Sequence, residues 1–207
     1  MKQNKANSKF VYLISPNKIK NENFYTDLAL VFSSKKVGFF QLRLKKETRK
    51  KRIVIGKKIK DICKKYKVKF LINDDPTLAK KLNADGCHLG QKDMSLIKAR
   101  KILKNKIIGI TCHNSINLAK KAIHNGADYL AFGAFYPSKT KITKYKASLN
   151  TLKLVKKITA SPIVAIGGIN LGNYKKLLLN KANFLAISSY IWKNKKYKPL
   201  EAIKRLK

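Results

Sequence analysis

Short, continuously apolar runs alternate along this chain with segments that repeat apolar residues at helical spacing. Runs of this kind are typical of strands buried on both faces, as in a parallel sheet covered by helices. We expect strands at residues 11–16, 37–44, 70–72, 107–111, 129–135, 162–166 and 184–187, with another ending at 88–90. We expect helices at residues 24–32, 47–66, 94–103, 115–126, 149–158 and 199–206, and a short one after residue 74.

Eight strand–helix units within 207 residues predict an α/β fold made of a single (β/α)8 TIM barrel. The alternative is a doubly wound open sheet. That alternative is less favoured because no G-x-G-x-x-G motif follows the first strand. We therefore predict one domain over residues 1–207, which begins with a flexible, basic extension at residues 1–9.

The apolar run that follows the basic N-terminus is too short for a signal peptide core or a membrane span. Cys63, Cys87 and Cys112 are scattered and form no C-x-x-C pair. This spacing argues against a disulfide framework and against a zinc site, and it suits a reducing compartment. We therefore expect a cytoplasmic protein with no membrane partner.

The formal net charge of +38 has two interpretations. It indicates either binding to nucleic acid or a membrane surface, or a compositional bias spread over every solvated face. The bias is favoured because lysines occur in pairs along the expected helices, and arginine, the better fork for phosphates and bases, is scarce. We expect no specific nucleic-acid partner, but the field would attract small phosphorylated substrates. The sequence leaves open whether the chain forms a homo-oligomer.

Two carboxylates follow the ends of neighbouring expected strands, between Lys69 and Asp93. Asp74 comes after the strand at 70–72, and Asp93 lies just beyond the strand that ends at residue 90. Mg²⁺ prefers hard oxygen ligands and is usually held by one or two carboxylates together with substrate phosphates. We therefore hypothesise that Asp74 and Asp93 bind Mg²⁺ and that the metal binds a phosphate. Asp74 could instead cap the following helix, although Asp75 is the better candidate for that cap.

Further polar residues gather at the carboxyl ends of the expected strands, where TIM barrels place their chemistry. They are cations, hydroxyls, amides, glycines and an imidazole: Gln41, Arg43, Lys45, Asn73, His88, Gly90, Thr111, Ser138, Thr140, Lys141, Gly168, Ser188 and Ser189. Taken singly, each has a simpler explanation, such as a solvated charge for Arg43 or a structural imidazole for His88. Together they are typical of a site that binds phosphate oxygens, and they include no nucleophile paired with a base.

Several segments resemble thiamine phosphate synthase, in the superfamily that includes the TenI-type thiazole tautomerases. They are QLRLK (41–45), INDD (72–75), ADGCHLGQKD (84–93), GITCH (109–113), GADYLAFGAFYPSKTK (126–141) and PIVAIGGI (162–169). The resemblance implies a Mg²⁺-dependent transferase that joins hydroxymethylpyrimidine diphosphate to a thiazole phosphate. Its products would be thiamine phosphate and pyrophosphate. Diphosphate would leave first, and the thiazole nitrogen would then attack the pyrimidinylmethyl cation, so no general base is needed.

The resemblance also implies residue roles. Asp74 and Asp93 would bind Mg²⁺, and the catalytic cations would be Arg43, Lys45 and Lys141. The pyrimidine diphosphate would contact Gln41, Arg43, Lys45, Asn73, Thr111 and Lys141, and the thiazole phosphate would contact Ser138, Thr140, Gly168, Ser188 and Ser189. The same motifs place Leu42, Leu44, His88 and Gly90 among the substrate-binding residues.

Three positions depart from the family pattern. Leu44 stands where glutamate is usual, Ser138 where threonine is usual, and Ser188 where an apolar residue is usual. Strand alternation should turn Leu44 away from Arg43 and Lys45, so this change would remove an ion pair rather than a phosphate contact.

The alternative function is a metal-free, TenI-like thiazole tautomerase with His113 or His88 as its acid or base. A tautomerase has no use for the carboxylate pair and the cations, which favours the synthase. A non-catalytic nucleic-acid binder is a third possibility, but no RNP, KH, zinc-finger or helix-turn-helix signature supports it.

Overall fold

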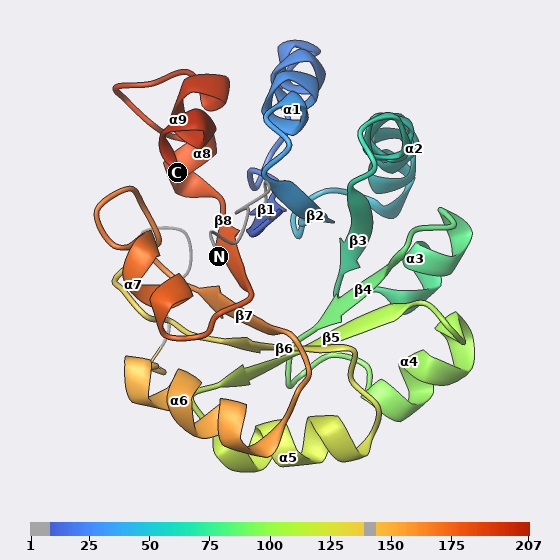
Figure 1. Ribbon diagram of the computed structural model, residues 1–207. Helices are drawn as coiled ribbons and strands as arrows, with labels where there is room; N and C mark the ends of the chain where they lie inside the picture. Colours follow the sequence, from blue (N-terminus) through green and yellow to red (C-terminus); the bar gives the residue numbers. More distant parts are fainter. Residues whose placement is uncertain (1–8, 139–143) are drawn as a thin grey trace, which may run out of the picture.

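Eight parallel strands close into a barrel in the computed structural model, which describes residues 9–138 and 144–207 (Figure 1). The strands are β1 (Val11–Ile14), β2 (Val37–Leu42), β3 (Lys69–Asn73), β4 (Gly86–Leu89), β5 (Ile107–His113), β6 (Tyr129–Phe132), β7 (Ile163–Ile166) and β8 (Phe184–Ile187). Strands that are consecutive in sequence pair with each other, and β1 pairs with β8 to close the barrel. The predicted TIM barrel is confirmed, and the open-sheet alternative is wrong.

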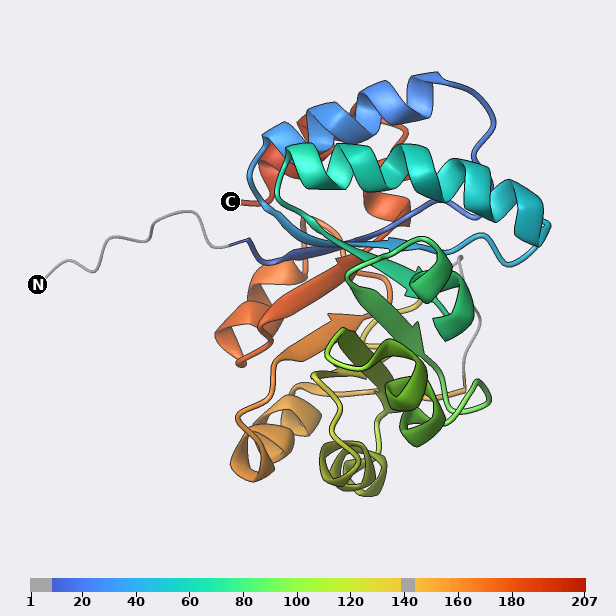
Figure 2. The same ribbon diagram turned by 90° about the vertical axis from the view of Figure 1, so that its right-hand side faces the viewer.

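The helices surround the barrel, and α1 and α2 lie side by side on its outside (Figures 1 and 2). They are α1 (Asn23–Ser33), α2 (Arg49–Lys65), α3 (Pro76–Lys81), α4 (Leu96–Leu103), α5 (Ile116–His124), α6 (Leu149–Ile158), α7 (Tyr174–Leu179), α8 (Ser189–Trp192) and α9 (Pro199–Arg205). Asp75 caps α3 by accepting the Leu78 N–H at 2.8 Å, as the sequence predicted. This cap leaves the carboxylate of Asp74 available for another role. None of the described helices combines the length and the apolar character that a membrane span requires.

Apolar side chains form two clusters, one on each side of the barrel wall. Within β1, Val11 and Leu13 belong to the cluster that packs against the helices, whereas Tyr12 and Ile14 belong to the smaller inner cluster. This division follows from the alternation of side chains along a strand. The inner cluster also contains Tyr129, so two tyrosines stand among the residues that fill the barrel interior.

Several strands are shorter than the sequence predicted: β1 ends at Ile14, before Pro16, β7 begins at Ile163, and β2 and β6 also end early. β2 ends at Leu42, so Arg43 and Lys45 lie in the loop after the strand rather than on it. β6 ends at Phe132, although the apolar run continues, because Ala134 exchanges backbone hydrogen bonds with the segment at 145–147. Helices α7 and α8 were not predicted, since each is too short to show a sustained helical period.

The predicted domain limits and the flexible extension at residues 1–9 remain predictions, because residues 1–8 lie outside the described part of the chain. Lys9, the first described residue, donates a hydrogen bond from Nζ to the carbonyl oxygen of Lys67 at 2.8 Å.

Candidate active site

Two adjoining cavities lie where the strands end. The first, called the carboxylate cavity, is lined by residues that include Gln41, Lys45, Asn73, Asp74, His88, Gly90 and Asp93. The second, called the serine cavity, is lined by residues that include Ser15, His113, Ser138, Gly168, Ser188 and Ser189. Both are bordered by Ile14, Arg43, Thr111, Ile166 and Ala186. Counting space open to solvent, they measure about 620 and 870 Å³, which suits small-molecule ligands.

The two predicted metal ligands meet in the carboxylate cavity. The side chains of Asp74 and Asp93 lie within hydrogen-bonding range of each other. Lys45 Nζ lies 2.6 Å from Asp74 Oδ2, and Asp93 Oδ2 accepts the Gly90 N–H at 2.7 Å. Asp74 has a φ of 63°, an uncommon backbone conformation for a residue other than glycine, and its N–H donates to the His88 carbonyl at 2.8 Å. Strained residues of this kind cluster at functional sites.

The two carboxyl groups have opposite pKa shifts. Burial acts to raise the pKa of Asp74, but the hydrogen bonds with Lys45 and Asp93, together with the charge of Lys45, outweigh it and lower this pKa. Burial, followed by the contact with Asp74, raises the pKa of Asp93. Two carboxylates in contact need either a shared proton or a cation between them, so the pair is suited to bind a positive charge.

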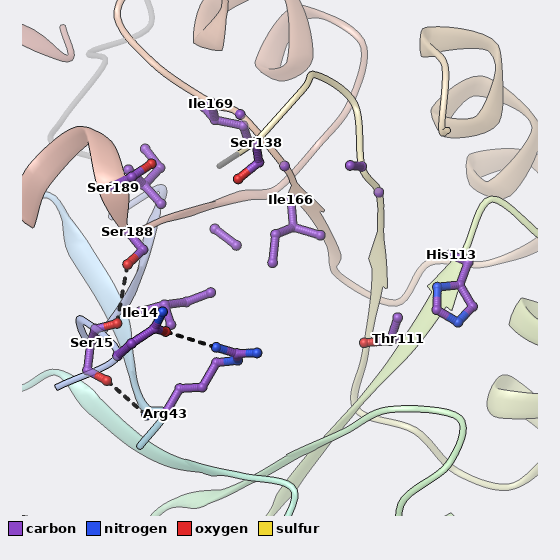
Figure 3. Close-up of a pocket in the computed structure, with 17 residues that line it drawn as sticks. Ile14, Ser15, Arg43, Thr111, His113, Ser138, Ile166, Ile169, Ser188 and Ser189 are labelled. Atoms are coloured by element: carbon purple, nitrogen blue, oxygen red, sulfur yellow. Dashed lines mark hydrogen bonds between the residues drawn. The ribbon is translucent and has the colours of Figure 1, made fainter. Parts of the chain in front are cut away.

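Arg43 stands at the border between the two cavities. Figure 3 shows its guanidinium reaching toward the serine cavity, where Nη1 donates to Asn17 Oδ1 at 3.1 Å. Its backbone N–H donates to Ser15 Oγ at 2.9 Å. Because the side chain borders both cavities, it can contact an anion in either of them.

The serine cavity is lined by Ser138 from the segment after β6, Gly168 from the loop after β7, and Ser188 and Ser189 from the start of α8. Figure 3 shows the three serines around this cavity. Gly168 has a φ of 59°, and a Cβ at this position would lie 2.3 Å from the Pro137 carbonyl oxygen. Only glycine fits this turn without displacing its neighbours. The hydroxyl of Ser188 donates to the Ser15 carbonyl at 3.2 Å, so it ties β8 to the end of β1.

Gln41, His88 and Thr111, all predicted from the strand ends, share the carboxylate cavity with two tyrosines that the sequence did not single out. Tyr12 and Tyr129 occupy strand positions whose neighbours are also apolar, and they therefore resemble ordinary core residues. Burial raises the pKa of both tyrosines well above the ordinary value, so both hydroxyls keep their protons. Ser15 and Asn17 were also missed, because they follow a strand whose polar loop carries no recognisable motif.

Leu42 and Leu44 are placed differently from the other predicted residues. They are 3% and 2% exposed and pack in the cluster between barrel and helices. Neither side chain borders the carboxylate cavity or the serine cavity, and this placement gives no support to direct substrate contacts. Both border a third cavity that shares Lys45, Asn73 and Asp74 with the carboxylate cavity and also includes Arg52. Arg52 Nη1 lies 3.6 Å from Asp75 Oδ2, and its Nε has no hydrogen-bond partner within the described residues. Arg52 is thus a candidate for the partner of the ion pair expected to be lost with Leu44.

Two predicted residues, Thr140 and Lys141, lie outside the described part of the chain. Elsewhere, His113 borders the serine cavity and stacks on Tyr145 at 3.9 Å between ring centroids. Across residues 9–138 and 144–207, no group of three or more His, Cys, Asp or Glu side chains is arranged to hold a metal ion. A metal at Asp74 and Asp93 would thus need ligands from water or substrate, which is the usual arrangement for Mg²⁺.

The chain matches the family described as thiamine monophosphate synthase over residues 11–191. It belongs to the thiamine monophosphate synthase family. Within this family, the thiamine-phosphate synthase of Pelagibacter ubique (strain HTCC1062) is 81% identical over 207 residues, covering 100% of both chains. The thiamine-phosphate synthase of Nitrosomonas eutropha (strain DSM 101675 / C91 / Nm57) is 39% identical over 183 residues, covering 88% of this chain and 86% of the relative.

A solved structure also supports membership of this family. The thiamine phosphate pyrophosphorylase from Pyrococcus furiosus superposes with a TM-score of 0.83 at 28% identity, covering 97% of this chain and 94% of that one. The resemblance predicted from the strand-end motifs is confirmed. As a member of the thiamine monophosphate synthase family, the chain is an enzyme of the transferase class.

Proposed function

We propose that this enzyme is a thiamine-phosphate synthase, which condenses hydroxymethylpyrimidine diphosphate with a thiazole phosphate to give thiamine phosphate and pyrophosphate. The main support is the pair of adjoining cavities that share Arg43 and Thr111. One cavity offers two carboxylates and a lysine, and the other offers hydroxyls and a glycine turn. This division suits two different phosphorylated substrates whose reacting ends meet at the shared border.

Mg²⁺ is the cofactor that best fits the carboxylate cavity. Asp74 and Asp93 provide hard oxygen atoms, and their mutual contact favours a cation over two bare charges. When bound, Mg²⁺ would neutralise charge on the oxygens of the departing diphosphate. Lys45, already paired with Asp74 at 2.6 Å, adds a second positive charge beside the carboxylates.

The remaining chemistry in this proposal is substitution without a general base. The bond between the pyrimidine methylene carbon and the diphosphate oxygen breaks, and its electron pair leaves with the diphosphate. Arg43, Lys45 and Lys141 stabilise the negative charge that develops on the leaving group. The thiazole nitrogen then donates its lone pair to the methylene carbon, while the serine cavity holds the thiazole phosphate in position through Ser138, Gly168, Ser188 and Ser189, with Thr140 as a further predicted contact.

A TenI-like thiazole tautomerase is the alternative function, and the position of His113 in the wall of the serine cavity favours it. Such an enzyme would move a proton on the thiazole without metal or diphosphate. The carboxylate pair and Lys45 would then have no part in the reaction, which makes this alternative the weaker explanation of the site.

Pyrophosphate release from the purified protein tests the proposal. The reaction contains pyrimidine diphosphate, thiazole phosphate and Mg²⁺, and matched reactions omit one substrate or contain EDTA. The synthase predicts release only when both substrates and the metal are present. Release that is unchanged in EDTA would contradict the metal site. No release from folded protein, together with isomerisation of a thiazole phosphate tautomer, would establish the alternative instead.

The other expectations about the cellular role stay predictions. The chain is expected to act on small molecules, with no specific nucleic-acid partner. A cytoplasmic location is compatible with Cys63, Cys87 and Cys112, which are buried thiols. The predicted possibility of a homo-oligomer can be measured by sedimentation.

A further inference from the structure

Five polar side chains from five strands form a continuous hydrogen-bonded chain across the barrel interior. Gln41 Nε2 donates to Tyr12 Oη at 3.1 Å, and the two hydroxyls of Tyr12 and Tyr129 lie 2.8 Å apart. Tyr129 Oη lies 2.8 Å from His88 Nδ1, and His88 Nε2 lies 2.9 Å from Thr111 Oγ1. All five side chains border the carboxylate cavity, and Thr111 also borders the serine cavity.

These hydrogen-bonded side chains occupy space in the barrel interior that aliphatic side chains usually fill. Interiors of TIM barrels are usually filled with branched aliphatic residues. Here the interior instead contains the polar side chains of Tyr12, Gln41 and Tyr129, which are only 2–3% exposed. A Cβ at Gly109 would lie 1.8 Å from Cζ of Tyr129, so the absence of a side chain on β5 admits the tyrosine ring. The His88 ring stacks on Tyr129 at 5.6 Å and 18°. The arrangement therefore fixes ring positions as well as hydrogen bonds.

With Gln41 Nε2 as the donor to Tyr12, only one direction gives every hydroxyl hydrogen in the hydrogen-bonded chain a partner. The amide N–H of Gln41 can only donate, so Tyr12 accepts with its oxygen and has its single proton left for Tyr129. In this direction Tyr129 donates to His88 Nδ1, and a neutral His88 ring carries its proton on Nε2. His88 Nε2 then donates to Thr111, whose own hydroxyl hydrogen is left to point toward the cavities.

We propose that Tyr12, Tyr129 and His88 are positioning residues that hold the Thr111 hydroxyl as a hydrogen-bond donor at the border of the two cavities. The acceptor would be an oxygen or nitrogen atom of the pyrimidine diphosphate. This part of the inference rests on the proposed synthase function. The direction of the hydrogen-bonded chain rests on the geometry alone and is tested without substrate.

The first test reads the tautomer of His88 by two-bond ¹H–¹⁵N correlation in protein labelled with ¹⁵N-histidine. The protein contains three histidines, so single substitutions at the other two, His113 and His124, assign the signals. We expect a neutral ring with the proton on Nε2. A proton on Nδ1 alone would reverse the direction of the hydrogen bonds, and a doubly protonated ring would donate to both Tyr129 and Thr111. Either result would overturn the proposal, whatever the activity of the enzyme.

The second test breaks the chain at Tyr129→Phe, which keeps the ring and its stacking on His88 and removes only the hydroxyl. We expect kcat/KM for the pyrimidine diphosphate to fall about tenfold, which corresponds to the free energy of one hydrogen bond, while KM for the thiazole phosphate stays unchanged. Tyr174→Phe is the matched control. Tyr174 is equally buried and donates its hydroxyl to the Lys207 carbonyl, but it borders neither cavity.

A double-mutant cycle separates positioning from general packing. If Tyr129 acts only through Thr111, Tyr129→Phe should cost almost nothing in a Thr111→Val background, whereas Thr111→Ser should keep the effect. Additive losses in the double variant would overturn the proposed role of Tyr129. Absence of synthase activity in both the wild type and the Tyr174→Phe control would instead contradict the proposed function, and the tautomer measurement would still decide the direction of the chain.

Discussion

The contact between two carboxylates makes Asp93→Asn the most informative single substitution in the site. Asp93 Oδ2 accepts the Gly90 N–H at 2.7 Å, and its side chain lies within hydrogen-bonding range of Asp74. Asparagine has nearly the same shape, so its Oδ1 can keep the Gly90 bond while its Nδ2 donates to Asp74. The variant therefore replaces a repulsive contact with a hydrogen bond and removes one negative charge from the proposed metal site.

These changes predict opposite effects on stability and on activity. Two like charges about 4 Å apart repel by about 1 kcal/mol in water, and screening keeps such terms small at partly exposed sites. Without metal, we therefore expect the free energy of unfolding to rise by about 0.5–1 kcal/mol. With Mg²⁺, kcat/KM should fall by at least about a hundredfold, because loss of an outer partner of a metal ligand alone costs about 10–100-fold.

Three measurements check this prediction. Urea unfolding in EDTA gives the stability of the metal-free proteins, the melting temperature during Mg²⁺ titration reports metal binding, and pyrophosphate release gives kcat/KM. Asp61→Asn, at an exposed position of α2, is the matched control for loss of one carboxylate. An Asp93→Asn enzyme with kcat/KM within about twofold of the wild type would refute the assignment of Asp93 as a metal ligand. A metal-free variant less stable than the wild type by more than about 1 kcal/mol would show that the pair supports the fold instead.

Three further predictions concern the site and the core. Gly168→Ala forces a side chain into a turn with φ of 59° and against the Pro137 carbonyl. It should lower the free energy of unfolding by about 1–3 kcal/mol and raise KM for the thiazole phosphate. Gly172→Ala is the control and should do neither, because a Cβ at Gly172 would lie 3.4 Å from its nearest neighbour, Asn170 Oδ1. Lys141→Ala should lower kcat/KM about a hundredfold, as for a lost donor to developing charge, and a change under about twofold would remove Lys141 from the catalytic cations. Burial raises the pKa of the Cys112 thiol to about 12, so iodoacetamide near neutral pH should modify Cys112 only after unfolding. Mass spectrometry follows the modification, and labelling of the native protein at the rate of an exposed cysteine would contradict this prediction.

Much of the fold could be predicted because the relevant signals are local. Apolar runs of strand length and helical periods are patterns of residues that are close together in the sequence. Their alternation leaves few possible architectures for a chain of this length. The carboxyl ends of parallel strands meet at one end of a barrel, so the strand pattern alone predicts that residues such as Asn73, Asp74 and Thr111 lie near one another. The ends of β2 and β6 could not be predicted, since backbone hydrogen bonds to distant segments, such as Ala134 with Tyr145, decide where a ladder stops.

The sequence by itself determined the barrel architecture and most of the polar residues at its mouth. Only the tertiary structure decided which face of each strand lines the interior. Strands buried on both sides carry apolar residues on both faces, so alternation separates two sets without showing which one turns inward. Closure of the barrel turned Tyr12 and Tyr129 toward the cavity and Leu42 toward the helices, and it brought Asp74 into contact with Asp93. Contacts between strands distant in sequence are a property of that closure, and therefore no local pattern contains them.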